Sequence, residues 1–311
     1  MKNPLFYAKV LLFGEYGVLQ NSKGLSLPLD DFKGSLKFPI AKSEAVIESN
    51  RLLRAYADNL AVLNQSVDLD LRFDMEQLNR DIANGLYFDS NIPQGYGIGS
   101  SGALVAALYE RYATRKIDVD RDLDKGKIKR LKNVFAEMEN YFHGTSSGLD
   151  PLVCYLKLPL LIHSKTGVDT VDMPTCKSGK GSVFLLNSGT PGQTEPMINI
   201  FFEKLKSQGF RRTIKAEFTR YNNACIDAFM KRELGGVFDN LKALSAWAYA
   251  HLRPMIPNSL LEIWAQGIQS NDYYLKLCGS GGGGYILGFT LDYEKTRRLL
   301  KDYSIDLIYR I

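Results

Sequence analysis

Short apolar runs and longer amphipathic stretches alternate along the first half of this chain. Residues 8–13 form an apolar run typical of a buried strand, and residues 24–30 alternate apolar with polar side chains, as a partner strand would. Residues 85–93 have the composition of a further strand, which Pro93 ends. The pattern therefore predicts strands that pair with one another near the N-terminus.

Two later stretches have the spacing of helices. Residues 103–114 are predicted as one helix and residues 121–142 as the next. The second helix has apolar side chains at intervals of three and four residues, which line one face: Leu131, Val134, Phe135, Met138 and Phe142. Glu139 flanks this apolar face, at the boundary between its buried and exposed sides.

A second region opens near residue 181 with the apolar segment 182–187, which predicts a strand. Helices follow, and Ser259 with Glu262 has the pattern of a capping box at the start of one of them. The chain of 311 residues is long enough for two domains. We predict an N-terminal domain of residues 1–178 and a C-terminal domain of residues 179–311.

Composition and charge narrow the class of protein. The chain has 39 basic and 34 acidic residues, and its charged clusters alternate in sign, so nucleic-acid binding has little support. The four cysteines have neither metal-ligand nor disulfide spacing, which fits a reducing compartment. Gly14 and Glu15 interrupt the apolar N-terminal stretch, and no cleavage site follows it. We expect a cytoplasmic globular protein that neither spans a membrane nor binds nucleic acid.

A glycine-rich loop precedes the first predicted helix. Its glycines offer backbone N–H groups without obstructing side chains, and the helix N-terminus adds partial positive charge, so phosphate is the natural ligand. The predicted nucleotide-binding residues are Gly95, Gly97, Gly99, Ser100, Ser101 and Gly102.

Two further interpretations of this loop stay open. It can be a flexible turn that enters a helix. It also spells GxGxxG, the fingerprint of dinucleotide-binding proteins, and Asp118 and Asp120 lie about twenty positions further on. That fingerprint requires an apolar strand after its helix, whereas a charged segment follows here. A nicotinamide-dependent oxidoreductase is therefore the weaker alternative.

Three charged residues are candidates for chemistry, although each can also have an ordinary structural role. Asp150 precedes Pro151 and can cap a helix, but glycines and hydroxyl residues stand before it, as where a backbone approaches a ligand. Lys9 can be a surface residue of its strand or, close to Asp150, can keep that carboxylate ionised. Glu139 can be a helix-boundary residue or, with Ser101, a ligand of Mg²⁺.

Four consecutive glycines, residues 281–284, lie between two apolar segments near the C-terminus. A flexible linker would have polar residues on both sides. We therefore expect a place where the backbone approaches another group closely.

Three segments together resemble the three motifs of the GHMP kinases, the family of galactokinase and of homoserine, mevalonate and phosphomevalonate kinases. The segment "AKVLLFGEYGVL" (8–19) resembles motif one, "IPQGYGIGSSGAL" (92–104) motif two, and "KLCGSGGGGYIL" (276–287) motif three. They occur in the family's order and span nearly the whole chain. The segment "HGTSSGLD" (143–150) is most similar to the mevalonate kinase branch, whereas "GEYGVL" also resembles phosphomevalonate kinases.

This resemblance implies a fold, a reaction and a set of residue roles. The fold would be α+β, with an N-terminal domain similar to ribosomal protein S5 domain 2 and a ferredoxin-like C-terminal domain with extra helices. ATP would phosphorylate an alcohol with the help of Mg²⁺, and mevalonate, in isoprenoid precursor synthesis, is favoured over phosphomevalonate. The implied roles are a base for Asp150 with Lys9 assisting, Mg²⁺ ligands for Ser101 and Glu139, and substrate-side positions for Glu15, Thr194, Gly281 and Gly282.

Three features depart from the family pattern, and the first is that motif one lacks the usual Pro-Gly before Lys9. Tyr16 stands where mevalonate kinases usually have His, and Ser146 replaces a common Pro. A non-catalytic sensor of the same fold, which binds its ligand without chemistry, is a further alternative. A homodimer is one assembly that the resemblance allows.

Overall fold

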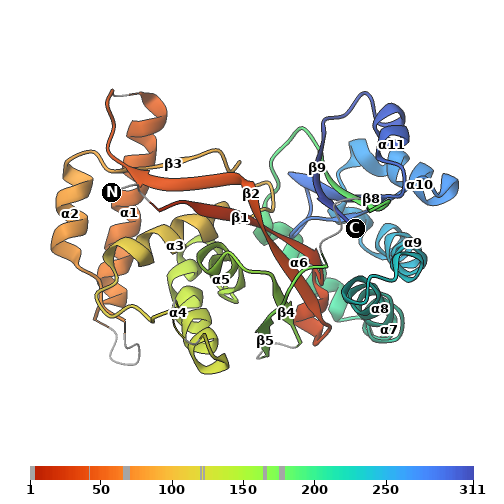
Figure 1. Ribbon diagram of the computed structural model, residues 1–311, viewed down its shortest axis with the longest axis horizontal. Helices are drawn as coiled ribbons and strands as arrows, with labels where there is room; N and C mark the ends of the chain where they lie inside the picture. Colours follow the sequence, from red (N-terminus) through yellow and green to blue (C-terminus); the bar gives the residue numbers. More distant parts are fainter. Residues whose placement is uncertain are drawn as a thin grey trace. The chain divides into compact units, whose positions relative to one another are not determined.

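The computed structural model of the chain describes residues 4–41, 43–65, 71–119, 121, 123–163, 167–174 and 179–311 (Figure 1). The chain forms two compact units, each built from several stretches. Unit one contains the chain up to Lys9, Pro28–Pro93 and Gly99–Leu158; unit two contains Val10–Leu27, Gln94–Ile98 and Pro159–Ile311. The predicted domain boundary follows residue 178, and residues 175–178 lie outside the described residues. The division into 1–178 and 179–311 stays a prediction.

The first sheet contains strands that continue from one unit into the other. Its members are β1 (Phe6–Phe13), β2 (Gly24–Lys37), β3 (Tyr87–Ser90), β4 (Leu160–Ile162) and β5 (Val168–Thr170), in the order β1-β2-β4-β5 with β3 paired to β2. In unit one, the end of β2 pairs antiparallel with β3. In unit two, its first residues pair antiparallel with β4. The strands predicted at 8–13 and 24–30 are confirmed, and the second of them extends to Lys37. A strand is also present within 85–93, but it covers only Tyr87–Ser90.

The helices of unit one surround a buried apolar core. They are α1 (Glu44–Leu63), α2 (Met75–Ala83), α3 (Ser100–Tyr112), α4 (Lys125–His143) and α5 (Leu149–Leu156). Helices α3, α4 and α5 contact one another and lie together in Figure 1. Leu131, Phe135 and Met138 of α4 are fully buried, which confirms the apolar face expected from their spacing. Both predicted helices are present, and α4 begins where the side chain of Asp124 accepts a hydrogen bond from the backbone of Lys127.

Unit two is built on an antiparallel sheet of order β7-β8-β6-β9. These strands are β6 (Ser182–Asn187), β7 (Tyr273–Leu277), β8 (Tyr285–Thr290) and β9 (Ile305–Arg310). The helices are α6 (Thr194–Leu205), α7 (Gln208–Thr213), α8 (Thr219–Met230), α9 (Leu234–His251), α10 (Leu261–Ser270) and α11 (Tyr293–Leu299), with a π-helical turn at Ile214–Phe218 and 3₁₀ turns at Gly17–Gln20, Arg253–Met255 and Asn258–Leu260.

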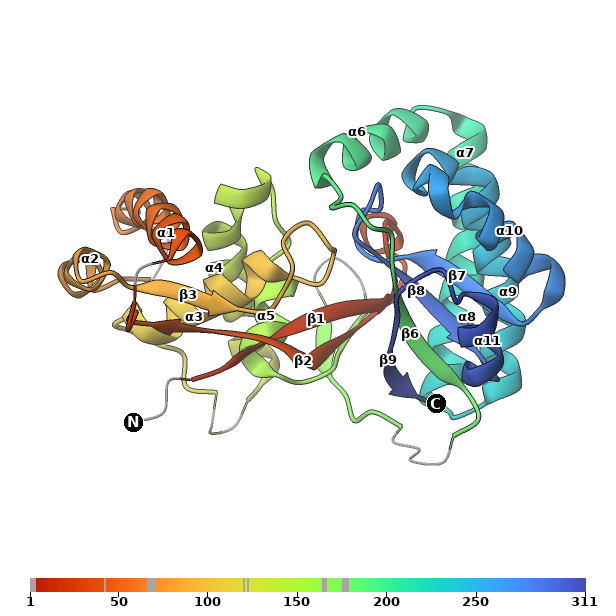
Figure 2. The ribbon, with the colours of Figure 1, turned by 90° about the horizontal axis from the view of Figure 1, so that it is seen from above.

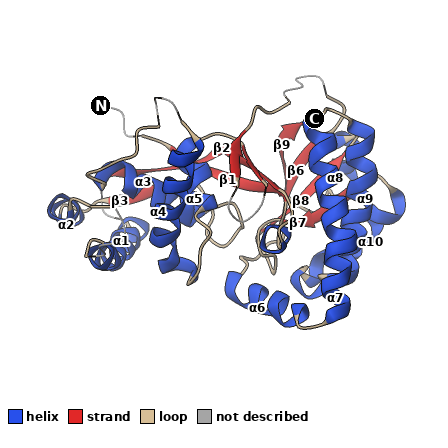
Figure 3. Ribbon diagram, turned by 90° about the horizontal axis from the view of Figure 1, so that it is seen from below, coloured by secondary structure: helices blue, strands red, loops and turns tan. Residues whose placement is uncertain are grey.

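The order of elements in this second sheet is strand, helices, strand, strand, helix, strand, which is the ferredoxin-like arrangement. Figures 2 and 3 show helices α8, α9 and α10 on one side of the sheet. Strands β7 and β8 are buried along their whole length. The expected C-terminal architecture and the strand at 182–187 are therefore confirmed, and the fold class is α+β.

The prediction of a capping box at Ser259 and Glu262 was wrong. Helix α10 begins at Leu261, and no side chain caps it, because Ser259 already lies within the 3₁₀ turn Asn258–Leu260. The side chains of Cys154, Cys225 and Cys278 are buried, while Cys176 lies outside the described residues. None of the helices in the described ranges combines the length and apolar character that crossing a bilayer requires.

Candidate active site

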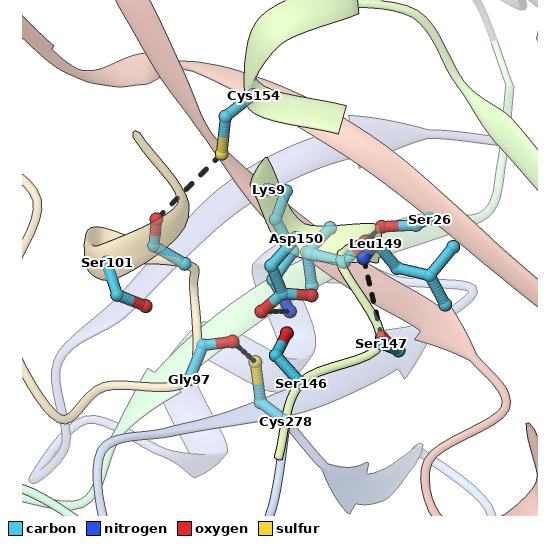
Figure 4. Close-up of polar contacts among 12 residues, drawn as sticks. Lys9, Ser26, Gly97, Ser101, Ser146, Ser147, Leu149, Asp150, Cys154 and Cys278 are labelled. Carbon is cyan, nitrogen blue, oxygen red and sulfur yellow. Dashed lines mark hydrogen bonds and ion pairs between the residues drawn. The ribbon is translucent and has the colours of Figure 1, made fainter. Parts of the chain in front are cut away.

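The structure places Lys9 and Asp150 in direct contact within unit one. Lys9 lies on β1 and Asp150 in the first turn of α5, and Lys9 Nζ is 2.7 Å from Asp150 Oδ2. Figure 4 shows the two side chains directed toward each other. The lysine side chain is 5% exposed and the aspartate side chain 40% exposed. The cation is therefore enclosed, while its carboxylate partner is open to an incoming molecule.

Asp150 does not cap its helix, contrary to its simplest structural role. The N-cap residue of α5 is Gly148, with a φ of 70°, and no side chain caps the helix. A Cβ atom at Gly148 would come within 2.7 Å of the backbone nitrogen of Ala136 in α4, so only glycine allows this close approach. The start of α5, and with it Asp150, is thus fixed against α4.

Gly102 also lies close to the backbone of Asp150. A Cβ atom at this position would lie 2.9 Å from both the carbonyl carbon of Asp150 and the nitrogen of Pro151. Gly102 therefore lets α3 pack directly on the first turn of α5. Its expected role in nucleotide binding stays a prediction, and this packing role is one that sequence reasoning missed.

Glu139 and Ser101 also meet within unit one. Ser101 Oγ donates to Glu139 Oε1 at 3.1 Å, and Ser146 Oγ donates to Glu139 Oε2 at 2.5 Å. Glu139 is 3% exposed. Burial raises its pKa from an ordinary value of 4.5 to about 7, and the charge of Asp150 acts in the same direction, whereas the two serines and Lys9 oppose the shift. Ser146 is a site residue whose role the sequence did not reveal.

The glycine-rich loop of motif two is divided between the units. Gly99, in unit one, is the N-cap residue of α3 with a φ of 79°, and Ser100, Ser101 and Gly102 form the first helical residues. Helix α3 therefore starts three residues earlier than the apolar pattern predicted. Gly95 and Gly97 belong to unit two, where a Cβ atom at Gly97 would lie 2.5 Å from the carbonyl oxygen of Cys278.

The four glycines of motif three form a tight connection between β7 and β8 rather than a linker. All four have positive φ. A Cβ atom at Gly281 would lie 2.6 Å from Met255 O, and one at Gly283 would lie 2.7 Å from Pro191 O. The close backbone approach that the apolar flanks predicted is confirmed.

Glu15 is paired with a lysine that the sequence did not single out. Lys276 Nζ lies 2.5 Å from Glu15 Oε2, and both side chains are about equally buried, at 5% and 6% exposure. The neighbouring Tyr16 donates to Ser280 O at 2.6 Å and packs its ring on Phe201 of α6. Motif one thus contacts motif three within unit two. Lys276 is the first residue of the motif-three segment, and that position was its only signal in the sequence.

The remaining substrate-side residues expected from the sequence also lie in unit two. Thr194 is the first residue of α6. Gly282 approaches the same helix, since a Cβ atom there would lie 2.8 Å from the sulfur of Met197. The binding roles of Glu15, Thr194, Gly281 and Gly282 stay predictions.

The dinucleotide interpretation of the GxGxxG sequence does not fit the fold. That fingerprint belongs to a parallel strand–helix–strand unit. Here β3, the strand before the loop, pairs antiparallel with β2. The literal match therefore gives no support to a nicotinamide-binding site.

Comparison with known proteins agrees with this architecture. Residues 62–157 match the family profile "GHMP kinases N terminal domain". Sequence comparison with curated proteins gave no match. Among solved structures, the chain is similar to L. major mevalonate kinase in complex with R-mevalonate, with 17% identity, a TM-score of 0.64, and coverage of 97% of this chain and 90% of that one.

Two further structures are similar at low identity. Lactococcus lactis galactokinase complexed with galactose has 11% identity and a TM-score of 0.66, with 98% and 92% coverage of this chain and that one. Streptococcus pneumoniae phosphomevalonate kinase in complex with phosphomevalonate and AMPPNP has 15% identity and a TM-score of 0.62, with 100% of both chains covered. The resemblance to the GHMP kinases is thereby confirmed, and the chain has the GHMP kinase fold.

Proposed function

We propose that the protein is an ATP-dependent kinase that phosphorylates the hydroxyl group of a small alcohol. The observation that carries the proposal is the ion pair of Lys9 and Asp150, in which the enclosed lysine holds a partly exposed carboxylate. Gly102 packs this carboxylate's helix against the N-terminal turn of α3. A base and a helix N-terminus suited to phosphate thus lie together in unit one.

Asp150 would accept the proton of the acceptor hydroxyl. Lys9 would keep Asp150 ionised and would neutralise negative charge on the reacting oxygens. Phosphoryl transfer needs mainly positioning and charge neutralisation from a protein, and the N–H groups at the start of α3 supply both. The nucleotide roles of the motif-two residues are part of this proposal.

Glu139 and Ser101 fit Mg²⁺, because the preferred ligands of this ion are hard oxygen atoms. A carboxylate oxygen of Glu139 and the hydroxyl of Ser101 lie 3.1 Å apart, and burial raises the pKa of Glu139 although Lys9 opposes the shift, so a further cation would stabilise the ionised carboxylate. In the described part of the chain, no cluster of three or more His, Cys, Asp or Glu residues forms a metal site. Glu139 and Ser101 would hold the ion together with phosphate oxygens and water. The bound ion would neutralise charge on the transferred phosphoryl group.

We propose mevalonate as the acceptor, with phosphomevalonate as the alternative. A phosphorylated acceptor brings about −1.5 to −2 additional charge and requires basic groups to bind it. Near motif one in unit two, Lys276 is paired with Glu15, and Lys23 Nζ is 2.6 Å from Asp227 Oδ1. Because carboxylates already neutralise both lysines, the acceptor side of this unit favours a substrate without a phosphate. The mevalonate-bound L. major enzyme and the phosphomevalonate-bound S. pneumoniae enzyme share the fold, so the choice between the two acceptors rests on the pairing of these lysines.

The test is to measure ADP release with mevalonate, phosphomevalonate, galactose and homoserine under identical conditions and to compare kcat/KM. Asp150→Asn protein serves as the control for contaminating kinases. We expect mevalonate to give the highest kcat/KM. A preference for phosphomevalonate would reverse the choice of acceptor and leave the kinase assignment intact. Absence of ADP release with every alcohol, in protein that binds ATP, would favour the non-catalytic sensor.

A further inference from the structure

The carboxylate of Glu139 is held at both oxygen atoms by serine hydroxyls. Ser101 Oγ donates to Oε1, and Ser146 Oγ donates to Oε2. The shorter of these bonds, at 2.5 Å, comes from Ser146. Ser101 belongs to α3, whereas Ser146 lies in the loop between α4 and α5. Two separate elements therefore determine the orientation of one buried carboxylate.

The hydrogen-bond partners of Ser146 fix the direction of its own hydroxyl. Its Oγ accepts from the backbone N–H of Gly148 at 3.0 Å, and its backbone N–H donates to Asn140 Oδ1 at 2.7 Å. A serine hydroxyl has a single proton to donate. Because Ser146 Oγ accepts from Gly148, that proton is available to Glu139.

We infer that Ser146 is a positioning residue for the metal-binding carboxylate. By holding Oε2, it would turn Oε1 toward Ser101 and present that oxygen to the cation. Gly148, the N-cap residue of α5, would also connect this arrangement to the helix that carries Asp150. The inference rests on the proposed function, in which Glu139 and Ser101 hold Mg²⁺. Partners that orient a metal ligand typically account for a change of about 10- to 100-fold in metal affinity.

Ser147 provides a matched control in the same loop. Its Oγ accepts from the backbone N–H of Leu149 at 3.4 Å, as Figure 4 shows. Its side chain is exposed, whereas that of Ser146 is partly buried against Glu139. A general disturbance of the loop would affect Ser146→Ala and Ser147→Ala equally, whereas orientation of Glu139 depends on Ser146.

The experiment measures Mn²⁺ binding by electron paramagnetic resonance in the presence of AMPPNP, a nucleotide analogue that is not turned over. We expect Ser146→Ala to bind Mn²⁺ about tenfold more weakly than wild type. Ser146→Thr keeps the hydroxyl and should restore most of the affinity, and Ser147→Ala should match wild type. In steady-state assays, Ser146→Ala should require correspondingly more Mg²⁺ for half-maximal activity, with a smaller change in kcat at saturating Mg²⁺.

A double-mutant cycle with Glu139→Gln tests whether Ser146 affects Mn²⁺ affinity through Glu139. If Ser146 acts through this carboxylate, Ser146→Ala should cause little further loss of Mn²⁺ affinity in the Glu139→Gln background. Should Ser146→Ala melt far below wild type, Ser146→Cys offers the same comparison, because a thiol is a weaker donor.

Three results would overturn the inference. Unchanged Mn²⁺ affinity in folded Ser146→Ala would leave Ser146 as a loop residue only. Equal losses in Ser146→Ala and Ser147→Ala would attribute the effect to the loop. Wild-type protein that binds no Mn²⁺ with AMPPNP would overturn the metal site itself, and with it this inference, and that outcome is distinguishable because it appears before any substitution.

Discussion

At the scale of single residues, the candidate site depends on unequal exposure of paired charges. Lys9 is buried and Asp150 is not, although the two form one ion pair. The lysine loses its hydration and gains a fixed partner, while part of the carboxylate stays exposed to solvent. An ordinary surface ion pair, such as Lys37 with Asp89, exposes both side chains nearly equally, at 45% and 48%.

Replacement of Asp150 by asparagine tests the role of this carboxylate. The amide would keep a similar volume but could not accept a proton, so turnover should fall by about a hundred- to ten-thousand-fold with the fold and ATP binding retained. The measurement is kcat for ADP release together with ATP affinity. Asp89→Asn, at the exposed pair with Lys37, is the matched control and should retain wild-type turnover. Turnover near wild type in Asp150→Asn would remove Asp150 from the catalytic role.

Glu139 should make stability depend on pH when no divalent cation is present. Its pKa is about 7 in the folded protein against an ordinary 4.5, so the folded state binds this proton more tightly than the unfolded chain. The free energy of unfolding should therefore fall as pH rises from about 4.5 to about 7, by about 3 kcal/mol from this group. The raised pKa means that the folded state favours protonated Glu139. Loss of this proton at higher pH therefore lowers the free energy of unfolding.

The measurement is denaturant unfolding of wild type and Glu139→Gln in chelator-containing buffer between about pH 5 and 8. Glutamine cannot ionise, so its stability advantage over wild type should grow as pH rises through this range, toward and past the raised pKa. Titrating groups that do not interact with Glu139 are common to both proteins and cancel in the difference. A difference that does not vary with pH would contradict the shifted pKa of Glu139.

At the scale of elements, the site is formed where three helices meet at glycines. Gly102 brings α3 onto α5, and Gly148 brings α5 onto α4. Each contact is between backbones, so neither can be relieved by rotation of a side chain. The packing of these three helices therefore determines the position of Asp150.

Gly102→Ala should impair chemistry more than nucleotide binding. The added Cβ atom would meet the backbone of Asp150 and Pro151 at 2.9 Å and would displace α5. We expect a loss of about 1–3 kcal/mol in the free energy of unfolding. A displacement of about 1 Å at Asp150 should lower kcat by about a hundredfold.

The control for this substitution is Gly235→Ala in α9, where nothing lies within 4 Å of the added atom. Alanine at that helical position should be neutral or stabilising by about 0.5–1 kcal/mol. Equal kcat and stability of Gly102→Ala and wild type would show that the contact of α3 with α5 tolerates an additional atom.

At the scale of the whole molecule, the melting temperature should show which class of nucleotide the protein binds. A ligand that binds only the folded protein stabilises it by about 2.7 kcal/mol at a concentration about 100 times its Kd. We expect Mg²⁺ with ATP to raise the melting temperature by several degrees, and NAD to leave it unchanged, because the antiparallel pairing of β3 does not fit a dinucleotide fingerprint. A larger shift with NAD than with ATP would contradict the kinase proposal.

The elements and the family of folds could be predicted from the sequence alone. Apolar runs and helical spacing located β1, β3, β6, α3 and α4, because burial of one face imposes a local periodicity that the chain displays directly. The order of three motifs indicated the GHMP kinase fold. The need for glycine was also visible at residues 281–284, since a flexible linker would not lie between two apolar strands.

Which side chains meet depends instead on the tertiary packing. Nothing local connects Lys9 to Asp150, Glu139 to Ser101, or Glu15 to Lys276, because each pair joins elements that are far apart in the sequence. The same holds for Asp150, which resembled a helix cap until the structure assigned that position to Gly148. Spacing along a chain encodes the face of a helix or strand, whereas distance across a core is set by how those faces pack together.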